Sequence, residues 1–270
     1  MNAPPLLFDR ALHRRRLDRA APGFAAASFL KTRAAEDVLE RVEIIMRGFS
    51  RAVDLGARDG VFAGLLAQSP ASARIGFLIE TDLSWRMLAG RPGARVALDE
   101  ERLPFAEGSL DLVVSTLSLH WTNDLPGVFV QIRRALRPDG VFIGAFLGGG
   151  TLYELRQSLT EAETELRGGA GPRVSPFADA EDAAGLLQRA GFKLPVADAD
   201  RVSVRYPDPL ALLKDLRAMG ETNVLVDRPK QPLNRAVLAR AFEIYGERFA
   251  APEGGVNATF EIITATGWAP

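Results

Sequence analysis

Acidic residues and glycines stand at three places along the first half of this chain where strands are expected to end. Residues 53–60 read VDLGARDG, in which Asp54 lies in an apolar segment and is followed by Gly56 and Gly60. Asp82 comes 28 residues after Asp54, and Asp99 follows a third short apolar segment. Because the carboxyl ends of parallel strands meet at one edge of a sheet, the three positions are predicted to share one crevice.

These residue types suit the binding of a nucleoside. A strand that turns through glycines into a helix lets a cofactor approach the backbone closely, and Asp82 is placed to accept hydrogen bonds from ribose hydroxyls. Asp99 could accept the amine of adenine while Leu103 and its apolar neighbours sandwich the ring. Each residue alone is more often a loop residue or a helix cap. The ordered set, however, predicts a nucleoside pocket.

Two further residues are candidates for catalysis. His120 follows the fourth expected strand and has a side chain whose ordinary pKa suits proton removal, so it could be a general base or a substrate contact. The alternative is a partly buried histidine that is hydrogen-bonded to backbone, with Trp121 packing on the cap. Tyr153 opens a later helix and is expected to face the same mouth, together with Glu154 and Arg156. Glu154 has a second interpretation, as the partner of Thr151 in a capping box.

Alternating apolar segments supply the elements that would position these residues. Between about 51 and 146, short β-branched segments alternate with segments of helical period. The expected strands are 51–55, 74–80, 96–98, 110–116 and 141–146, and the expected helices are 33–47, 61–68, a short one after Ser84, and 125–136. Such alternation predicts a parallel sheet covered on both faces, with right-handed crossovers.

After residue 147 the pattern changes. Gly148–Gly150 break the alternation, and helices are expected at 151–166, 180–190, 210–219 and 235–249, with strands at 202–206 and 259–266. We therefore predict an α/β fold, a doubly wound and mostly parallel seven-stranded sheet with a helical cap. Its expected parts are an N-terminal helical segment (1–48), a cofactor-binding core (49–147), and a cap with a closing β-hairpin (148–270) that belongs to the same domain.

Composition narrows the classes of protein that remain. The chain has 270 residues, of which 47% are hydrophobic, and a formal net charge of -1, which gives no reason to expect nucleic acid as a partner. It contains no cysteine, so disulfides and thiolate metal sites are excluded. No apolar run approaches the roughly 20 residues that cross a bilayer. These features predict a cytoplasmic protein without a membrane span.

The basic run RALHRRRLDR at 10–19 could be a transit peptide or a nucleic-acid patch. We favour a solvated helix face, with Phe8, Leu12 and Leu17 or Ala20 packing inward, because no aromatic residues interleave with the arginines. The run also contains His13, one of the two histidines of the chain. An iron site of two histidines and a carboxylate would need both His13 and His120, and because His13 lies in the N-terminal basic stretch no metal site is predicted.

The motifs resemble those of class I S-adenosylmethionine-dependent methyltransferases. The resemblance rests on VDLGARDG, ETDLS, DEERLPF, LDLVVSTLSLHW and LRPDGVFIGAF. The later segments TLYELRQSLTEAETE, YPDP, LRAMGETN and ATFEII resemble one branch of that superfamily. This branch comprises mitochondrial assembly factors of respiratory complex I that are implicated in arginine hydroxylation, with their bacterial relatives. The malonyl-acyl-carrier-protein methyltransferases of biotin synthesis are more distantly similar.

The resemblance implies a cofactor, S-adenosylmethionine, and a place for each part of it. The methionine moiety would lie against Gly56 and Gly60, the ribose on Asp82, and adenine near Asp99 and Leu103. Ser115, with the residues up to Ser118, would line the floor under the sulfonium.

The family turn usually has glycine where this chain has Arg58, since the position needs permissive backbone angles. Either the side chain swings outward, pairing with Asp59, and cofactor binding survives, or the pocket has lost its usual ligand. We favour the outward position.

Three functions follow from these observations. The first is methyl transfer to a protein or carrier-bound substrate, which needs positioning of the nucleophile rather than a metal or a covalent residue. The second, implied by resemblance alone, is hydroxylation of an arginine in a complex I subunit. The third is a non-catalytic assembly factor that grips a partner with its cap, which Arg58 favours. The sequence leaves the oligomeric state open.

Overall fold

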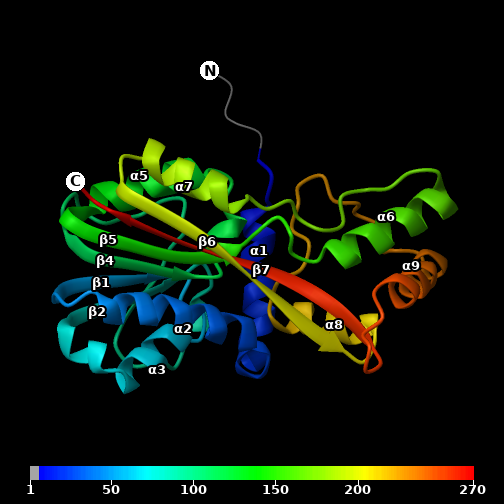
Figure 1. The fold of residues 1–270 in the computed structure, drawn as a ribbon, viewed down its shortest axis with the longest axis horizontal. Coiled ribbons are helices and arrows are strands. Elements are labelled where there is room, and N and C mark those ends of the chain that lie inside the picture. Colours follow the sequence, from blue (N-terminus) through cyan, green and yellow to red (C-terminus); the bar gives the residue numbers. More distant parts are fainter. Residues whose placement is uncertain (1–5) are drawn as a thin grey trace.

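The computed structural model describes residues 6–270, which form a sheet-centred body with a helical cap at one end (Figure 1). The N-terminal segment is helical, as expected, and comprises α1 (Arg10–Ala20), a 3-10 helix η1 (Ala21–Ala27) and α2 (Phe29–Ile44). Leu17 and Ala20 of α1 are buried, as is Phe8, which precedes this helix. The helix also buries His13, which the prediction of a solvated face with apolar residues packing inward did not include.

Seven strands form one sheet in the order β3-β2-β1-β4-β5-β7-β6. The first five strands pair in parallel, whereas β7 is antiparallel to both of its neighbours. The strands are β1 (Phe49–Leu55), β2 (Ile75–Asp82), β3 (Ala94–Ala97), β4 (Leu110–Thr116), β5 (Leu136–Leu147), β6 (Lys193–Tyr206) and β7 (Val256–Trp268). The predicted fold class is confirmed. The strand order reverses between β1 and β4, which is where doubly wound sheets bind ligands.

Helices cover both faces of this sheet because its strands are apolar on both sides. One face packs against α2 and α3 (Val61–Gln68), with η2 (Pro70–Arg74) beside them; the other packs against α5 (Leu125–Ala135) and α7 (Ala180–Arg189). A short α4 (Trp85–Leu88) lies near β2, β3 and α1. Every residue of β4 is buried, so the strand that carries the crevice floor is fixed by packing on both faces.

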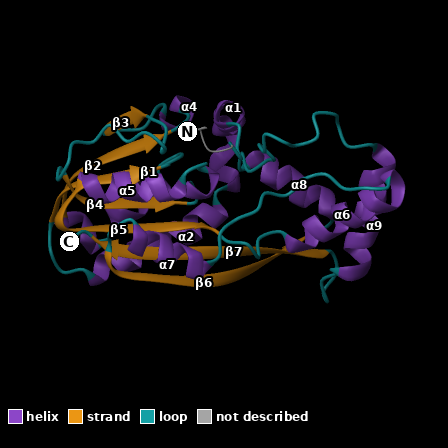
Figure 2. Ribbon diagram, turned by 90° about the horizontal axis from the view of Figure 1, so that it is seen from above, coloured by secondary structure: helices purple, strands orange, loops and turns teal. Residues whose placement is uncertain are grey.

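The cap consists of α6 (Tyr153–Arg167), α8 (Pro209–Ala218) and α9 (Arg235–Arg248), and it lies beyond the end of the parallel strands (Figure 2). The antiparallel pair β6–β7 runs from the sheet into this cap (Figure 1). Residues 148–270 are thus not cap alone, because α7 lies on the sheet. The boundaries at 48 and 147 stay predictions.

The closing hairpin is longer than the sequence suggests. β6 begins at Lys193 rather than near Val202, and most of its residues are exposed. It is an edge strand that tolerates Pro195 and the acidic residues at 198 and 200 because one row of its backbone groups faces solvent. The apolar alternation that reveals a half-buried strand is therefore missing from its first half.

The predicted capping box at Thr151 and Glu154 is wrong. The residue that precedes α6 is Leu152, at φ 52°, and no side chain caps the helix. The Thr151 hydroxyl and the backbone of Glu261 exchange hydrogen bonds, and Glu154 accepts from the hydroxyl and the backbone N–H of Thr259. Both side chains are used to join α6 to β7. No helix among residues 6–270 is long and apolar enough to cross a membrane.

Candidate cofactor crevice and cap cavity

The turn after β1 requires glycine at both predicted positions. Gly56 has φ 73° and Gly60 has φ 74°, a region that side chains rarely adopt. A Cβ on Gly56 would overlap the side chain of Ser118, and one on Gly60 would overlap the guanidinium of Arg91. Gly60 is also the residue that precedes α3.

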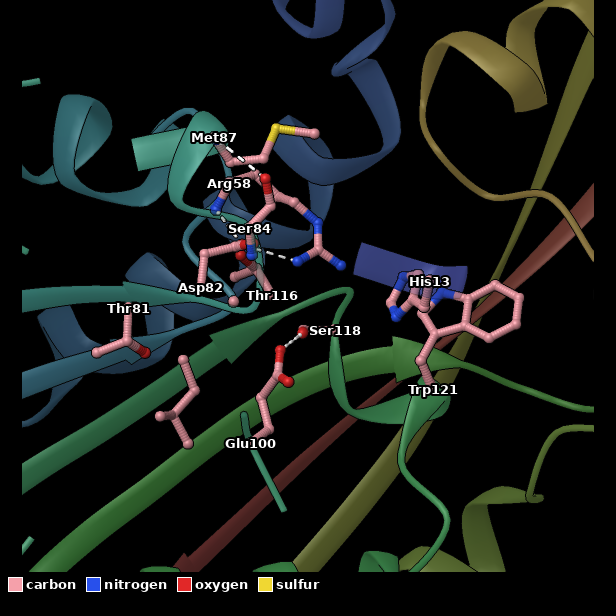
Figure 3. Close-up of polar contacts among 12 residues, drawn as sticks. His13, Arg58, Thr81, Asp82, Ser84, Met87, Glu100, Thr116, Ser118 and Trp121 are labelled. Atoms are coloured by element: carbon pink, nitrogen blue, oxygen red, sulfur yellow. Dashed lines mark hydrogen bonds and ion pairs between the residues drawn. The ribbon is translucent and has the colours of Figure 1, made fainter. Parts of the chain in front are cut away.

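Arg58 points inward, so the expected outward position is wrong. Its φ is positive, at 55°, as expected at a position that is usually glycine. Its side chain is nevertheless buried, with 1% of the residue exposed. Nη1 donates to Oδ2 of Asp82 at 2.8 Å, and Figure 3 shows the guanidinium between Asp82 and His13. Asp59 is not its partner. The buried carboxylate at the end of β2 gives the desolvated guanidinium its counter-charge.

Asp82 is completely engaged with the protein. It is fully buried; Oδ2 accepts from both the backbone N–H and Nη1 of Arg58, and Oδ1 accepts from the backbone N–H of Ser84. Burial opposes the charge on Arg58, but Asp82, Glu221 and Glu100 outweigh it and raise the pKa of that guanidinium. The two groups form a buried, charged pair.

Arg10 makes a comparable pair at the end of β3. Its Nη2 donates to Oδ1 of Asp99 at 2.7 Å and also to Glu100, and its Nη1 donates to the carbonyl of Trp121. These carboxylates overcome the effect of burial and raise the pKa of Arg10. Ser118 donates to Glu100 at 2.6 Å. The sequence did not indicate Arg10 or Glu100, since no local pattern links an N-terminal helix to a loop 90 residues later.

Asp54 is the one predicted acid that has no hydrogen-bond partner within residues 6–270. Both of its carboxylate oxygens are buried. Burial raises its pKa to about 7, although the nearby Lys31 opposes the shift. Lys31 is itself buried and donates to the carbonyls of Gly56 and Thr116 and to the Thr116 hydroxyl. An unpartnered acceptor at this depth is costly unless a ligand or water satisfies it.

Asp54→Asn is therefore expected to change the pH dependence of stability. The pKa of Asp54 is raised in the folded state, so its contribution is most favourable below its unfolded pKa of about 4 and is lost as pH rises towards about 7. Relative to the wild type, the variant should gain free energy of unfolding between pH 4 and pH 7. Urea denaturation at pH 4.5 and pH 8 measures this. A difference between the two proteins that does not vary with pH would contradict the assignment.

The two histidines lie on either side of Trp121. The His13 and Trp121 ring centroids are 5.1 Å apart, and those of His120 and Trp121 are 5.3 Å apart. Burial, then Arg58 and Arg10, lowers the pKa of His13 well below its ordinary value, so this ring is neutral. The sequence had suggested that the histidines were remote from each other. Within residues 6–270, no group of three or more potential metal ligands is arranged to hold an ion.

His120 has both ring nitrogens engaged. Nδ1 accepts from the backbone N–H of Leu147 at 3.4 Å, and Nε2 lies 3.2 Å from Glu221, which also accepts from the indole of Trp121 at 2.6 Å. This arrangement matches the histidine bonded to backbone that was the alternative to a general base. Through these contacts the ring of His120 joins Leu147 and Glu221 beside Trp121.

The other predicted site residues are placed as follows. Tyr153 does not face the mouth: it is 39% exposed, and its ring packs on that of Phe249, directly after α9, with 5.8 Å between the centroids. The Ser115 hydroxyl donates to the carbonyl of Leu55, and Leu103 is partly buried against the core. Arg156 donates to the backbone carbonyls of Gly149 and Thr151, which holds the loop before α6.

A large cavity of about 630 Å³ opens between the sheet and the cap. The core contributes Lys31, Arg58 and Trp121 to its wall. The cap and the segments around it contribute mostly apolar side chains, among them Leu155, Leu159, Val174, Phe177, Leu213 and Leu216. This volume is within the range of small-molecule sites. Sequence patterns could not reveal it, because its wall is drawn from α1 to β7.

The crevice fits S-adenosylmethionine in part. The turn has glycine at the two positions where a cofactor would approach the backbone, although the side chains of Ser118 and Arg91 lie against them. The unpartnered Asp54 offers acceptors for an ammonium group. Asp82 does not fit as it stands, because Arg58 occupies the carboxylate that ribose would need, whereas Asp99 has only Oδ1 engaged with Arg10 and its side chain is 32% exposed. Ribose can reach Asp82 only after Arg58 withdraws.

Comparisons with known proteins agree with this geometry. A family model described as a methyltransferase domain matches residues 53–144. Mouse (Mus musculus) mitochondrial arginine-hydroxylase NDUFAF5 is 41% identical over 97% of this chain and 77% of its own length. Malonyl-[acyl-carrier protein] O-methyltransferase of Methylovorus sp. (strain MP688) is 33% identical over the whole chain and 92% of its own length.

Solved structures share the fold at low identity. The YcgJ protein from Bacillus subtilis aligns with a TM-score of 0.58 at 12% identity, over 86% of this chain and 97% of its own. A phosphoethanolamine N-methyltransferase 2 from Haemonchus contortus, solved with S-adenosylhomocysteine, has a TM-score of 0.57 at 19% identity, over 96% of this chain and 60% of its own. Such likeness concerns the fold alone.

Proposed function

Because this chain belongs to the methyltransferase family that includes mitochondrial arginine-hydroxylase NDUFAF5 and malonyl-[acyl-carrier protein] O-methyltransferase, we propose that it transfers a methyl group from S-adenosylmethionine to a protein or carrier-bound acceptor. The observation that carries the proposal is the strand-end constellation. The glycine turn, Asp54, Asp82 and Asp99 all lie at the carboxyl ends of β1, β2 and β3, beside the reversal of strand order.

Each residue of this constellation has a stated task. Asp54 would accept from the amino group of the cofactor, Asp82 from ribose, and Asp99 from adenine, with Leu103 against the ring. Gly56 and Gly60 would let the backbone approach. The cofactor supplies an electrophilic methyl group, and the transfer needs mainly an aligned acceptor and the exclusion of water.

The acceptor would enter from the cap cavity, whose wall reaches Arg58 and Lys31 at the crevice. The engaged nitrogens of His120 and the outward position of Tyr153 do not support a base at either residue. What the chain contributes to the reaction on this proposal is therefore positioning.

Isothermal titration with S-adenosylmethionine and S-adenosylhomocysteine tests the proposal. We expect saturable one-to-one binding of both ligands, weakened by the need to displace Arg58. The matched control compares Arg58→Gly with the double variant Arg58→Gly, Asp82→Asn, which leaves no buried charge unpaired but lacks the ribose acceptor and should give no signal. No binding at millimolar ligand, in both the wild type and Arg58→Gly, would sink the enzyme assignment.

Two other functions are favoured by particular observations. The pairing of Arg58 with Asp82 favours an assembly factor that keeps the fold without catalysis. The 41% identity with arginine-hydroxylase NDUFAF5 favours hydroxylation of an arginine in a complex I subunit. Mass spectrometry of the complex I subunits from a deletion strain distinguishes the three functions: a lost methyl group, a lost hydroxyl group or no change identifies the function.

The cytoplasmic location stays a prediction, and the NDUFAF5 relatives are mitochondrial.

A further inference from the structure

The wall of the cap cavity combines apolar side chains with an excess of positive charge. Four of its basic side chains, those of Lys31, Arg58, Arg173 and Arg228, donate to partners within the protein, whereas Arg16, Arg217 and Lys230 have no acceptor among residues 6–270. A single carboxylate, that of Glu221, faces the same space and is engaged with His120 and Trp121. The cavity is thus an apolar chamber with unbalanced cations.

Three buried polar atoms of this wall have no hydrogen-bond partner among residues 6–270. They are Nη2 of Arg58, Nε of Arg16 and Oγ1 of Thr222. Arg58 is the most demanding of the three, because its side chain is 1% exposed and only Nη1 reaches Asp82. A buried guanidinium nitrogen without an acceptor costs free energy that a bound anion would recover.

The cations near Arg16 reinforce this requirement. Burial lowers the pKa of Arg16, and Arg217, Arg228 and Arg15 lower it further. Positive groups that repel one another beside an apolar chamber attract an anion, whereas a cationic or neutral ligand gains nothing from them.

We propose that the cap cavity binds an amphiphilic anion, a single aliphatic chain that ends in a carboxylate, with Nη2 of Arg58 as the anchor of the carboxylate. The chain lies against the apolar wall formed by residues such as Leu155, Leu159 and Leu213. A chamber of about 630 Å³ is large enough for a chain of roughly ten carbons, given that sites of 300–1,000 Å³ hold drug-sized ligands. Binding of this anion does not depend on S-adenosylmethionine.

Titration of decanoate and decanol into the full-length protein without cofactor tests the proposal. The two probes share the chain and differ in charge, and we expect decanoate to bind at least 10-fold more tightly. Decyltrimethylammonium should show no saturable binding. Equal affinity for decanoate and decanol would overturn the role of the cations, and failure of both to bind would overturn the site.

Variants test the contacts of the carboxylate and those of the aliphatic chain separately. Arg58→Lys keeps a positive charge for Asp82 but removes Nη2, so it should weaken decanoate about 10-fold and leave decanol unchanged. Arg217→Gln, on the exposed face of α8, should weaken decanoate by a smaller factor without affecting folding. Leu213→Trp should weaken both probes by narrowing the chamber.

The control is Arg86→Gln, which removes an exposed arginine outside the cavity wall and should bind both probes as the wild type does. A loss of decanoate binding in Arg86→Gln equal to that in Arg217→Gln would show that net charge alone is responsible and would contradict the site. Since no cofactor is present, the outcome is independent of the methyltransferase assignment.

Discussion

Arg58→Gly should raise the affinity for S-adenosylmethionine by about 10- to 100-fold, which is about 1.4–2.8 kcal/mol of binding free energy. In the wild type the guanidinium occupies the carboxylate that ribose would use, and it places a positive charge beside the path of a sulfonium. Glycine vacates Asp82 and adopts φ 55° without strain. Isothermal titration of wild type and variant in the same buffer measures the gain.

The matched control is Asp139→Gly. Asp139 is another non-glycine residue with positive φ, at 61°, and it lies near the start of β5, at the end of the sheet opposite the crevice. Glycine there relieves the same kind of backbone strain but should leave the affinity unchanged. An Arg58→Gly variant that binds no better than the wild type would show that the guanidinium is not what limits cofactor entry.

Asp82→Asn should destabilise the protein by about 3–5 kcal/mol, because it leaves the buried Arg58 without a counter-charge. The amide still accepts from the backbone N–H of Ser84, so the loop geometry is preserved. Adding Arg58→Gly should restore most of the lost stability, since the double variant has neither charge. Urea denaturation of the wild type, the two single variants and the double variant forms a double-mutant cycle.

Measurements of cofactor binding distinguish the role of Asp82 as ribose acceptor from its role in stability. The double variant should be stable yet should not bind S-adenosylmethionine, because the ribose acceptor is gone. Asp198→Asn breaks an exposed pair with Arg41 and provides a control that should cost less than about 1 kcal/mol. Additive effects of the two substitutions at 58 and 82 would contradict the coupling.

The sequence predicted the fold because its signals are local. Apolar segments of strand length, glycines at the turn after β1 and acids at strand ends can each be recognised within about ten residues. The parallel core and the antiparallel closing pair were predicted from these signals, whereas the strand order is known only from the structure. The exposed first half of β6 was missed because an edge strand does not need an apolar face.

The side chains that pair with the acids of the crevice could not be predicted from local signals. The direction of Arg58 depends on how deeply Asp82 is buried, which is a property of the assembled sheet. Arg10 reaches Asp99 across 89 positions, and His13 packs on Trp121 from the same helix. Thr151 and Glu154 have the spacing of a helix cap, but β7 offers them partners that the local pattern does not show.

The continuity of β7 limits how the cap can move. Its 13 residues extend for roughly 40 Å, pairing with β5 in the sheet and, at the far end, with the part of β6 that leads into α8. A rigid rotation of the cap about a hinge would have to bend this two-stranded ribbon and break its ladder of hydrogen bonds. The ribbon therefore holds the cap at a fixed separation from the sheet, so the width of the chamber depends on the segment 222–233, which joins α8 to α9 and lines the cavity.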